Sequence, residues 1–304
     1  MPGATEILLL IEQEHGLIPQ EISGDTSPAE FSYDGFLVGR SHECDFPKYI
    51  THLPVLSVPR IDAQDSQAIH DQVTAALSAK EPLYTIDVEK LVALHPDLIL
   101  TQDVCDVCAV DAQTIGRIAA SLQPSPAVLN LTPRSLDEVL DNVLEVGRAV
   151  GLFEAAKRVH KRLQSTIEAA KRVADEAVAA CGGRRKRIEL LEWTAPLFGA
   201  GHWTAEMLLL AGGRMQLNPA RQPSVQTTPE LVLAARPEYL VVAPCGLPLA
   251  AAAAEATALL AQPWFRALPA VAAGRVAAVD GSAHFNRQGP RLAEAFCWLV
   301  AWCV

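Results

Sequence analysis

The sequence predicts an α/β protein made of two similar lobes, each with a central parallel sheet, joined by one long rigid helix. Three observations favour this fold. Short apolar segments alternate with helical patterns, one pattern of helix cap, helix, proline, acid and strand occurs twice, and a long helix-forming stretch separates the two copies. With 304 residues, the chain also has the length of about two ordinary domains. We therefore expect one lobe over residues 1–134, a linking helix over 135–180 and a second lobe over 181–304.

Short runs of aliphatic and β-branched residues, bounded by turn residues, mark the expected strands. These strands are Gly35–Arg40, Leu53–Val58, Asp97–Gln102, Ala127–Leu129, Glu189–Glu192, Tyr239–Ala243 and Arg275–Val279. Apolar residues at helical spacing mark the expected helices. These helices are Thr5–Glu14, Ser66–Ala79, Asp111–Ser121, Thr204–Ala211, Pro248–Ala261 and Pro290–Trp302.

The repeat consists of Asp87–Gln102 and Thr228–Pro244. Each copy starts with a capping residue followed by a short amphipathic helix. Each helix ends at a basic residue or histidine directly before a proline, where helices tend to stop, and an acid and an apolar strand follow. The shared order of these features favours duplication of one α/β unit.

The linking segment runs from Ser135 to Ala180 and is rich in helix formers, with Gly151 as an interruption. Cys181 and the two glycines after it end the pattern. Because a helical linker is stiff, we expect two lobes at a fixed spacing and a cleft between them that changes little.

The composition excludes several classes of protein. The net charge of −10 argues against a nucleic-acid partner, which requires a basic face. No apolar run is long enough to span a bilayer, and the first residues do not resemble a signal peptide. The seven cysteines fit reduced thiols or metal ligands better than a disulfide scaffold. We expect a cytoplasmic protein from the sequence as written, and a periplasmic or cell-envelope protein if the true start lies upstream.

Thiols and an imidazole follow two strands expected in the first lobe. Ser41–Pro47 and Asp103–Cys108 should open on the same edge of its sheet, where α/β proteins bind ligands. They supply a candidate site for Zn or Fe, made of His42, Cys44, Cys105 and Cys108. The alternatives are that the cysteines are buried as small apolar residues, or that Cys105 and Cys108 form a redox pair.

Aromatic residues and a histidine follow the strands expected in the second lobe. Trp193, His202 and Trp203 lie after one strand, and Phe285 lies after another. Aromatic rings with a polar group are suited to gripping a flat, mostly apolar ligand. The alternative is that Trp193 belongs to the core. The chain contains no phosphate-binding loop, no serine hydrolase motif and no zinc-protease helix motif.

With these residues in view, the chain resembles the cobalamin (vitamin B12) and iron-chelate substrate-binding proteins of ABC transporters, and most closely the cobalamin-binding branch that often lacks a signal peptide. The stretches that carry the resemblance are Pro2–Leu8, Leu37–Pro47, Pro96–Val110, Glu192–Trp203 and Phe285–Leu292. The resemblance implies a class III periplasmic-binding-protein-like fold with the ligand between two lobes. It also implies ligand contacts at His42, Glu43, Cys44, Asp45, Trp193, His202, Trp203 and Phe285.

From these observations we expect a non-catalytic binding protein that holds cobalamin, another corrinoid or a related metal chelate in the cleft. It would serve ABC-type uptake or intracellular handling, with no covalent cofactor. We expect a monomer that does not insert into membranes and whose macromolecular partner, if any, is an ABC permease. The alternative is a cytoplasmic metal-dependent or CxxC redox enzyme that reuses the two-lobed fold.

Overall fold

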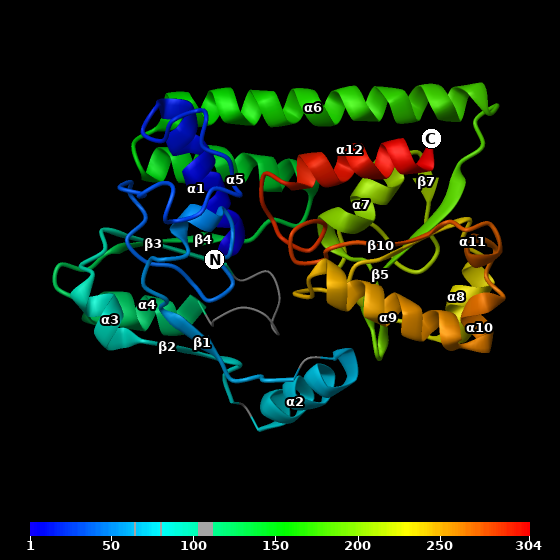
Figure 1. Ribbon diagram of the computed structural model, residues 1–304, viewed down its shortest axis with the longest axis horizontal. Coiled ribbons are helices and arrows are strands. Elements are labelled where there is room, and N and C mark those ends of the chain that lie inside the picture. The colour runs from blue at the N-terminus through cyan, green and yellow to red at the C-terminus, as the bar shows by residue number, and fades with distance from the viewer. Residues whose placement is uncertain (64, 80, 103–111) are drawn as a thin grey trace. The chain divides into compact units, whose positions relative to one another are not determined.

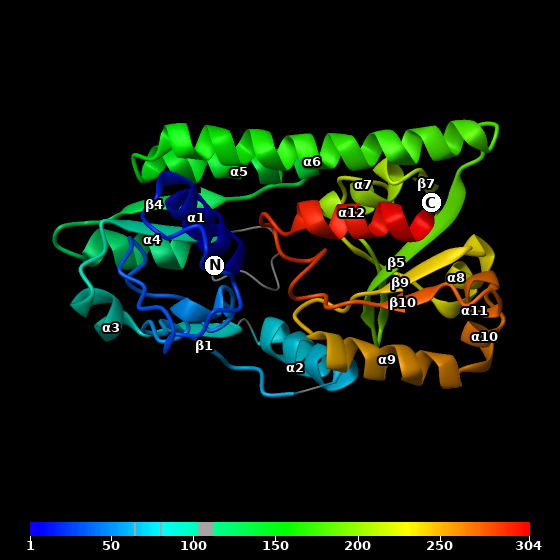
Figure 2. The same ribbon diagram turned by 45° about the horizontal axis from the view of Figure 1, so that its top comes forward.

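The computed structural model describes residues 1–63, 65–79, 81–102 and 112–304. The chain forms two compact units (Figures 1 and 2). Unit 1 comprises Met1–Asp62, Gln72–Pro133 and Leu140–Arg162, and unit 2 comprises Ala63–Asp71, Arg134–Val139 and Leu163–Val304. The stretch predicted as a linker is therefore shared between the units, and a short segment of the predicted first lobe belongs to unit 2.

Within the described residues, unit 1 contains two small sheets. Its elements are α1 (Pro2–His15), η1 (Lys48–Ile50), β1 (Ser57–Pro59), β2 (Tyr84–Ile86), α3 (Val88–Ala93), β3 (Leu98–Gln102), α4 (Ala112–Ser121) and β4 (Ala127–Leu131). Strands β1 and β2 pair antiparallel, and β3 and β4 pair parallel. Helix α2 (Ser66–Ser78) has residues in both units.

Unit 2 is built on a larger mixed sheet. Its strands are β5 (Lys186–Thr194), β6 (Leu197–Gly199), β7 (Gly213–Arg214), β8 (Val225–Gln226), β9 (Tyr239–Val242) and β10 (Val276–Ala278). Its helices are α7 (His202–Leu210), α8 (Pro229–Ala235), α9 (Leu249–Ala261), α10 (Pro263–Arg266), α11 (Pro269–Ala272) and α12 (Leu292–Cys303). The strand order is β10-β9-β5-β6-β8, and β5, β9 and β10 run parallel. Figures 1 and 2 show α9 on one side of these parallel strands and α7 and α12 on the other.

The predicted repeat folds in the same way in both units. The side chain of Asp87 caps α3, and that of Thr228 caps α8. Each helix is followed by a residue with a left-handed backbone, His95 with φ of 45° and Arg236 with φ of 46°. A proline, an acid and a parallel strand, β3 or β9, come next.

The long helical stretch consists of two helices. Helix α5 (Leu136–Ala149) ends before Gly151, whose φ of 74° is left-handed, and α6 (Phe153–Ala180) follows with 28 residues. The long helix is therefore α6, about 42 Å in length, and the single helix expected over 135–180 is broken at the glycine.

The strand predicted over Gly35–Arg40 is wrong. Apart from one isolated bridge between Arg40 and Val55, this segment is irregular in the structure. The reason is that side chains take its backbone donors: Phe36 N–H donates to Glu12 Oε1 at 2.6 Å, and Leu37 N–H donates to the Tyr33 hydroxyl at 2.9 Å.

Candidate functional site

His42 lies in the loop that follows the bridge at Arg40 and is held from two sides. Its backbone N–H donates to Ser57 Oγ at 3.1 Å, and its ring Nδ1 lies 2.8 Å from the same oxygen. Ser57 is itself buried at the start of β1. The imidazole is therefore fixed through Nδ1, which leaves Nε2 as the nitrogen that a ligand can meet.

The surroundings of His42 favour a neutral ring. Burial lowers the pKa of the imidazole below its ordinary value near 6.5, and this outweighs the Glu43 carboxylate, which raises it. Neutral imidazole is the form that coordinates metals. Coordination through Nε2 requires the tautomer with a proton on Nδ1, and Ser57 Oγ can accept that proton's hydrogen bond.

Tyr84 is a neighbour of His42 that sequence reasoning missed. It is the first residue of β2, and its ring centroid lies 5.3 Å from that of His42 with 33° between the planes. Both residues line one cavity. Tyrosinate and imidazole are both known iron ligands in haem proteins. The only signal in the sequence was one tyrosine within a short apolar and β-branched segment, Leu83–Ile86, which is common in proteins.

The other predicted residues of this loop have different environments. Glu43 and Asp45 are exposed, whereas Cys44 is buried with its Sγ 3.2 Å from Thr5 Oγ1 and 3.5 Å from Ser41 Oγ. Cys44 therefore packs as a small core residue.

Only two of the four predicted metal ligands, His42 and Cys44, lie among the described residues. Cys105 and Cys108 lie outside the described residues, so the four-ligand site remains a prediction. Within the described part of the chain, no group of three or more His, Cys, Asp or Glu side chains has a metal-binding arrangement.

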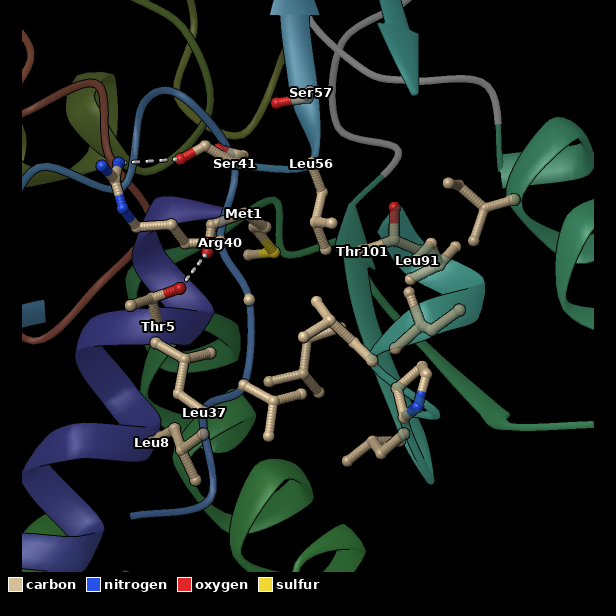
Figure 3. Close-up of a pocket in the computed structure, with 18 of the residues that line it drawn as sticks. Met1, Thr5, Leu8, Leu37, Arg40, Ser41, Leu56, Ser57, Leu91 and Thr101 are labelled. Carbon is tan, nitrogen blue, oxygen red and sulfur yellow. Dashed lines mark hydrogen bonds between the residues drawn. The ribbon is translucent and has the colours of Figure 1, made fainter. Parts of the chain in front are cut away.

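The cavity beside His42 and Tyr84 lies within unit 1 and has a volume of about 430 Å³ (Figure 3). Its walls are mostly apolar and come from the start of α1, the segment 36–43 and all of β3. Figure 3 shows Met1, Leu56 and Thr101 among the side chains around it. This volume falls in the range of small-molecule pockets.

In unit 2, the end of β5 carries Glu192 and Trp193. The Glu192 carboxylate accepts hydrogen bonds from Gly201 N–H at 3.0 Å and from the Ser224 hydroxyl, so it fixes the loop before α7. Trp193 is half-buried, and its Nε1–H donates to the carbonyl of Ala195 at 3.0 Å. The ring system is thus held in position and only partly covered.

His202 begins α7 and is also half-buried. Its φ of 49° is left-handed, and backbone hydrogen bonds with Arg221 and Gln222 hold it there. Burial is the main cause that lowers the pKa of its imidazole, and the positive charge of Arg134 lowers it further. Its buried Nδ1 has no hydrogen-bond partner among the described residues.

The structure brings Trp203 and Phe285 together in the interior of unit 2. Trp203 Nε1–H and the Thr204 hydroxyl donate to the carbonyl of Phe285 at 2.6 and 2.8 Å. Trp203 is 5% exposed and Phe285 is 0% exposed. The Trp203 ring centroid lies 5.8 Å from that of His202. In this conformation Trp203 and Phe285 present little surface to a ligand, so their contact with a ligand stays a prediction.

Among the described residues, no helix combines the length and apolar character needed to cross a bilayer. No curated protein matches the chain in sequence. Solved structures show the fold. The periplasmic heme-binding protein RhuT from Roseiflexus sp. RS-1 has a TM-score of 0.67 and 20% identity, over 99% of this chain and 94% of that chain.

Two further structures have the same fold. BhuT, a periplasmic heme-binding protein solved in complex with two hemes, has a TM-score of 0.64 and 22% identity, over 100% of this chain and 97% of its own. The vitamin B12 binding protein BtuF of Vibrio cholerae has a TM-score of 0.60 and 18% identity, over 88% of each chain. The sequence profile of the periplasmic binding proteins matches residues 55–283. Since this match spans most of the chain, the protein belongs to the periplasmic binding protein family.

Proposed function

We propose that this protein is the substrate-binding component of an ABC-type importer and that its substrate is cobalamin, another corrinoid or a related metal chelate such as heme. The observation that carries the proposal is His42: a half-buried imidazole, fixed through Nδ1 and favoured in its neutral form, beside a tyrosine and an apolar cavity. A non-catalytic role is consistent with the family, whose relatives above are described as binding proteins.

The chemistry of such a ligand fits the groups that unit 1 offers. A corrin or porphyrin is broad and mostly apolar, with a central metal that takes an axial nitrogen or oxygen ligand. His42 Nε2 supplies the nitrogen, and Tyr84 supplies a ring face or an oxygen beside it. The exposed carboxylates of Glu43 and Asp45 accept hydrogen bonds from the amide edge of a corrin.

Unit 2 offers a second set of groups. Trp193 supplies a partly exposed aromatic face, and His202 supplies a neutral imidazole. The cleft expected between the two lobes stays a prediction. The proposed function therefore depends on His42 and the cavity beside it in unit 1. Uptake by an importer requires the protein to meet its ligand outside the cytoplasm, and we propose a monomer that delivers the ligand to a permease.

The test is titration of the purified protein with hydroxocobalamin, cyanocobalamin and hemin, followed by absorption spectroscopy and calorimetry. Coordination by His42 replaces the exchangeable axial ligand of hydroxocobalamin, whereas cyanide blocks that position in cyanocobalamin. We therefore expect His42→Ala to weaken binding of hydroxocobalamin or hemin by about tenfold or more and to change the spectrum of the bound form. Binding of cyanocobalamin should change much less.

His15→Ala is the matched control, because His15 is an exposed imidazole at the end of α1. It should leave all three titrations unchanged. If none of the three chelates binds at tens of micromolar, the proposed substrate class is wrong. If hydroxocobalamin or hemin binds equally well to the wild type and to His42→Ala, the substrate class stands and the axial role of His42 is wrong.

A cytoplasmic metal-dependent or redox enzyme is the alternative, with chemistry at Cys105 and Cys108. Metal analysis of the purified protein distinguishes the two functions: stoichiometric Zn or Fe that is lost in Cys105→Ser favours the enzyme.

A further inference from the structure

Charged side chains are distributed unevenly along the sheet of unit 2. Residues 181–304 contain eleven Lys and Arg against eight Asp and Glu, whereas the whole chain has 25 against 35. Strands β5, β7, β9 and β10 are parallel and begin at one edge of the sheet. Cations lie at or shortly before each of these starts, and we call these seven residues the basic edge: Arg-Arg-Lys-Arg at 184–187, Arg214, Arg236 and Arg275.

Backbone and side-chain contacts hold the members of the basic edge next to one another. Arg187 and Arg214 are partners across β5 and β7. Arg187 Nε–H donates to the carbonyl of Arg236 at 2.6 Å. Arg275 lies over the ring of Tyr239 at the start of β9, with its guanidinium carbon 4.9 Å from the ring centroid. The basic edge is therefore one continuous patch.

Little of this positive charge is neutralised within the structure. Glu238 pairs with Arg184 and, at 3.5 Å, with Arg187. The three arginines at the starts of β7, β9 and β10 are exposed, and none of them has a carboxylate partner among the described residues. The last ten residues of α6, which lead towards β5, add two cations and two carboxylates and hence no net charge. Seven cations beside one carboxylate repel one another, so the basic edge favours a negatively charged partner.

Apolar side chains border the basic edge. Trp302, near the end of α12, is partly exposed, and its ring centroid lies 5.2 Å from that of Tyr239, the ring that Arg275 covers. Leu209 in α7 is 37% exposed, and its carbonyl accepts a hydrogen bond from Arg185 at 3.0 Å. The end of α12 lies beside β7 (Figures 1 and 2). Tryptophan prefers the boundary between water and lipid, so the patch combines cations with side chains suited to a bilayer surface.

We propose that the basic edge of unit 2 binds the surface of a lipid bilayer that contains anionic phospholipids. Lipid phosphates would pair with the exposed arginines, and Trp302 and Leu209 would lie at the level of the headgroups. Clusters of four to eight Lys and Arg are attracted to such surfaces, and cations beside exposed apolar side chains are typical of segments that lie on a membrane without crossing it. A nucleic acid would also pair with arginines, but an aliphatic side chain such as Leu209 offers it neither a hydrogen bond nor a stacking surface.

The net charge of −10 is compatible with this binding. At an ionic strength near 0.1 M, charges more than about 10 Å from the bilayer are largely screened, whereas the basic edge would lie against it. The inference goes beyond the proposed function and does not depend on it. Strand β5 is about 26 Å long from Lys186 to Thr194, and Trp193 lies at its other end. Contact of the basic edge with a bilayer would therefore leave the ligand edge of unit 2 free.

The test is co-sedimentation of the purified full-length protein with lipid vesicles. One set of vesicles contains equal parts of phosphatidylglycerol and phosphatidylcholine, and the other contains phosphatidylcholine alone. We expect binding to the first set only, with an affinity that falls steeply as salt is added. Arg214→Gln, Arg236→Gln and Arg275→Gln together should weaken binding by about a hundredfold, because each cation near an anionic surface contributes about fivefold.

Two further triple variants serve as controls. Lysine at the same three positions keeps the charge and should bind nearly as well as the wild type. Arg117→Gln, Lys157→Gln and Lys161→Gln together remove the same charge from exposed positions in unit 1 and should also bind nearly as well as the wild type. Contact of Trp302 with lipid is measured with phosphatidylglycerol that carries bromine on its acyl chains. Bromine should quench part of the tryptophan fluorescence of the wild type, and Trp302→Phe should lose that part.

Four results would overturn the proposal. The protein binds neither set of vesicles, or it binds both equally well. The glutamine variant and the unit 1 control lose the same affinity, which would be an effect of net charge alone. The lysine variant loses as much affinity as the glutamine variant, which would exclude an electrostatic cause. A mixed-sequence RNA or DNA binds at the same salt concentration while vesicles do not, which would assign the basic edge to nucleic acid. None of these measurements involves a metal chelate, so their outcome leaves the proposed function untouched.

Discussion

The clearest pH effect on stability is expected from Glu189, in the middle of the central strand β5. Its side chain is 2% exposed, and its Oε1 accepts a hydrogen bond from the backbone N–H of Gln216 at 2.6 Å. Burial raises the pKa of this carboxyl to about 7, against the backbone hydrogen bonds from Gln216 and Leu217 that lower it. Below about pH 7, the folded protein therefore holds Glu189 mainly as the protonated acid.

The size of the effect follows from this pKa. In the unfolded chain the carboxyl ionises near pH 4.5, and in the folded protein near pH 7. Between these values the folded state binds more protons, so stability falls as the pH rises, by about 1.4 kcal/mol per pH unit. The loss reaches about 3 kcal/mol and is constant above pH 7.

Glu189→Gln tests this reasoning, because glutamine has nearly the same shape, keeps the acceptor for Gln216 and cannot ionise. Near pH 4.5 the variant and the wild type should be similar in stability. By pH 8 the variant should gain about 3 kcal/mol relative to the wild type, which is roughly 6–12 °C in melting temperature for a unit of this size. Urea or thermal unfolding between pH 4.5 and 8 measures the difference.

The same change at an exposed site, Glu176→Gln in α6, is the control and should give a difference that hardly depends on pH. If the difference in unfolding free energy between Glu189→Gln and the wild type is the same at pH 4.5 and pH 8, folding does not raise the pKa of this carboxyl. The assignment of a buried, protonated acid in β5 would then be refuted.

Three further predictions concern helices and the ligand. Gly147→Ala should destabilise the protein by about 1–3 kcal/mol in urea unfolding, because the new methyl group would lie 2.2 Å from the Cβ of Ala156. By contrast, the methyl group of Gly116→Ala in α4 would meet no atom of the described structure within 4 Å apart from its chain neighbours and the backbone of its own helix, and this change should stabilise by about 0.5–1 kcal/mol. Thr228→Ala removes the cap of α8 and should cost about 1 kcal/mol in the same assay; an unchanged unfolding midpoint would contradict the capping role. Affinity for hydroxocobalamin should fall as the pH drops below the lowered pKa of His42, by about tenfold per pH unit, and a flat profile from pH 7 to 4 would argue against coordination by this imidazole.

Much of the fold could be predicted because its signals are local. A capping residue, a helical apolar pattern and a residue before proline identify α3 with β3, and α8 with β9, from a few neighbouring residues. Gly151 likewise marked the break between α5 and α6, although its effect was underestimated. The segment Gly35–Arg40 was mispredicted because its backbone partners, Glu12 and Tyr33, are side chains whose positions depend on the tertiary fold.

The candidate site was predicted less completely for the same reason. The sequence placed His42 after an apolar segment, but its fixing by Ser57 and its contact with Tyr84 join residues that are distant along the chain. Aromatic residues were also hard to assign. Trp203 and Phe285 are aromatic residues of the kind found at ligand-binding surfaces. In the structure, however, Trp203 donates its indole N–H to the backbone carbonyl of Phe285 inside unit 2. Burial of this kind cannot be read from the local sequence.

The left-handed turn shared by His95 and Arg236 has a practical consequence for comparing the two units. The two residues have different side chains but almost the same φ, so the conformation itself, rather than a particular amino acid, is common to the two copies. Substitution erases residue identity faster than backbone shape. When the two units are compared, these two turns therefore provide fixed reference points from which the strands that follow them, β3 and β9, can be aligned.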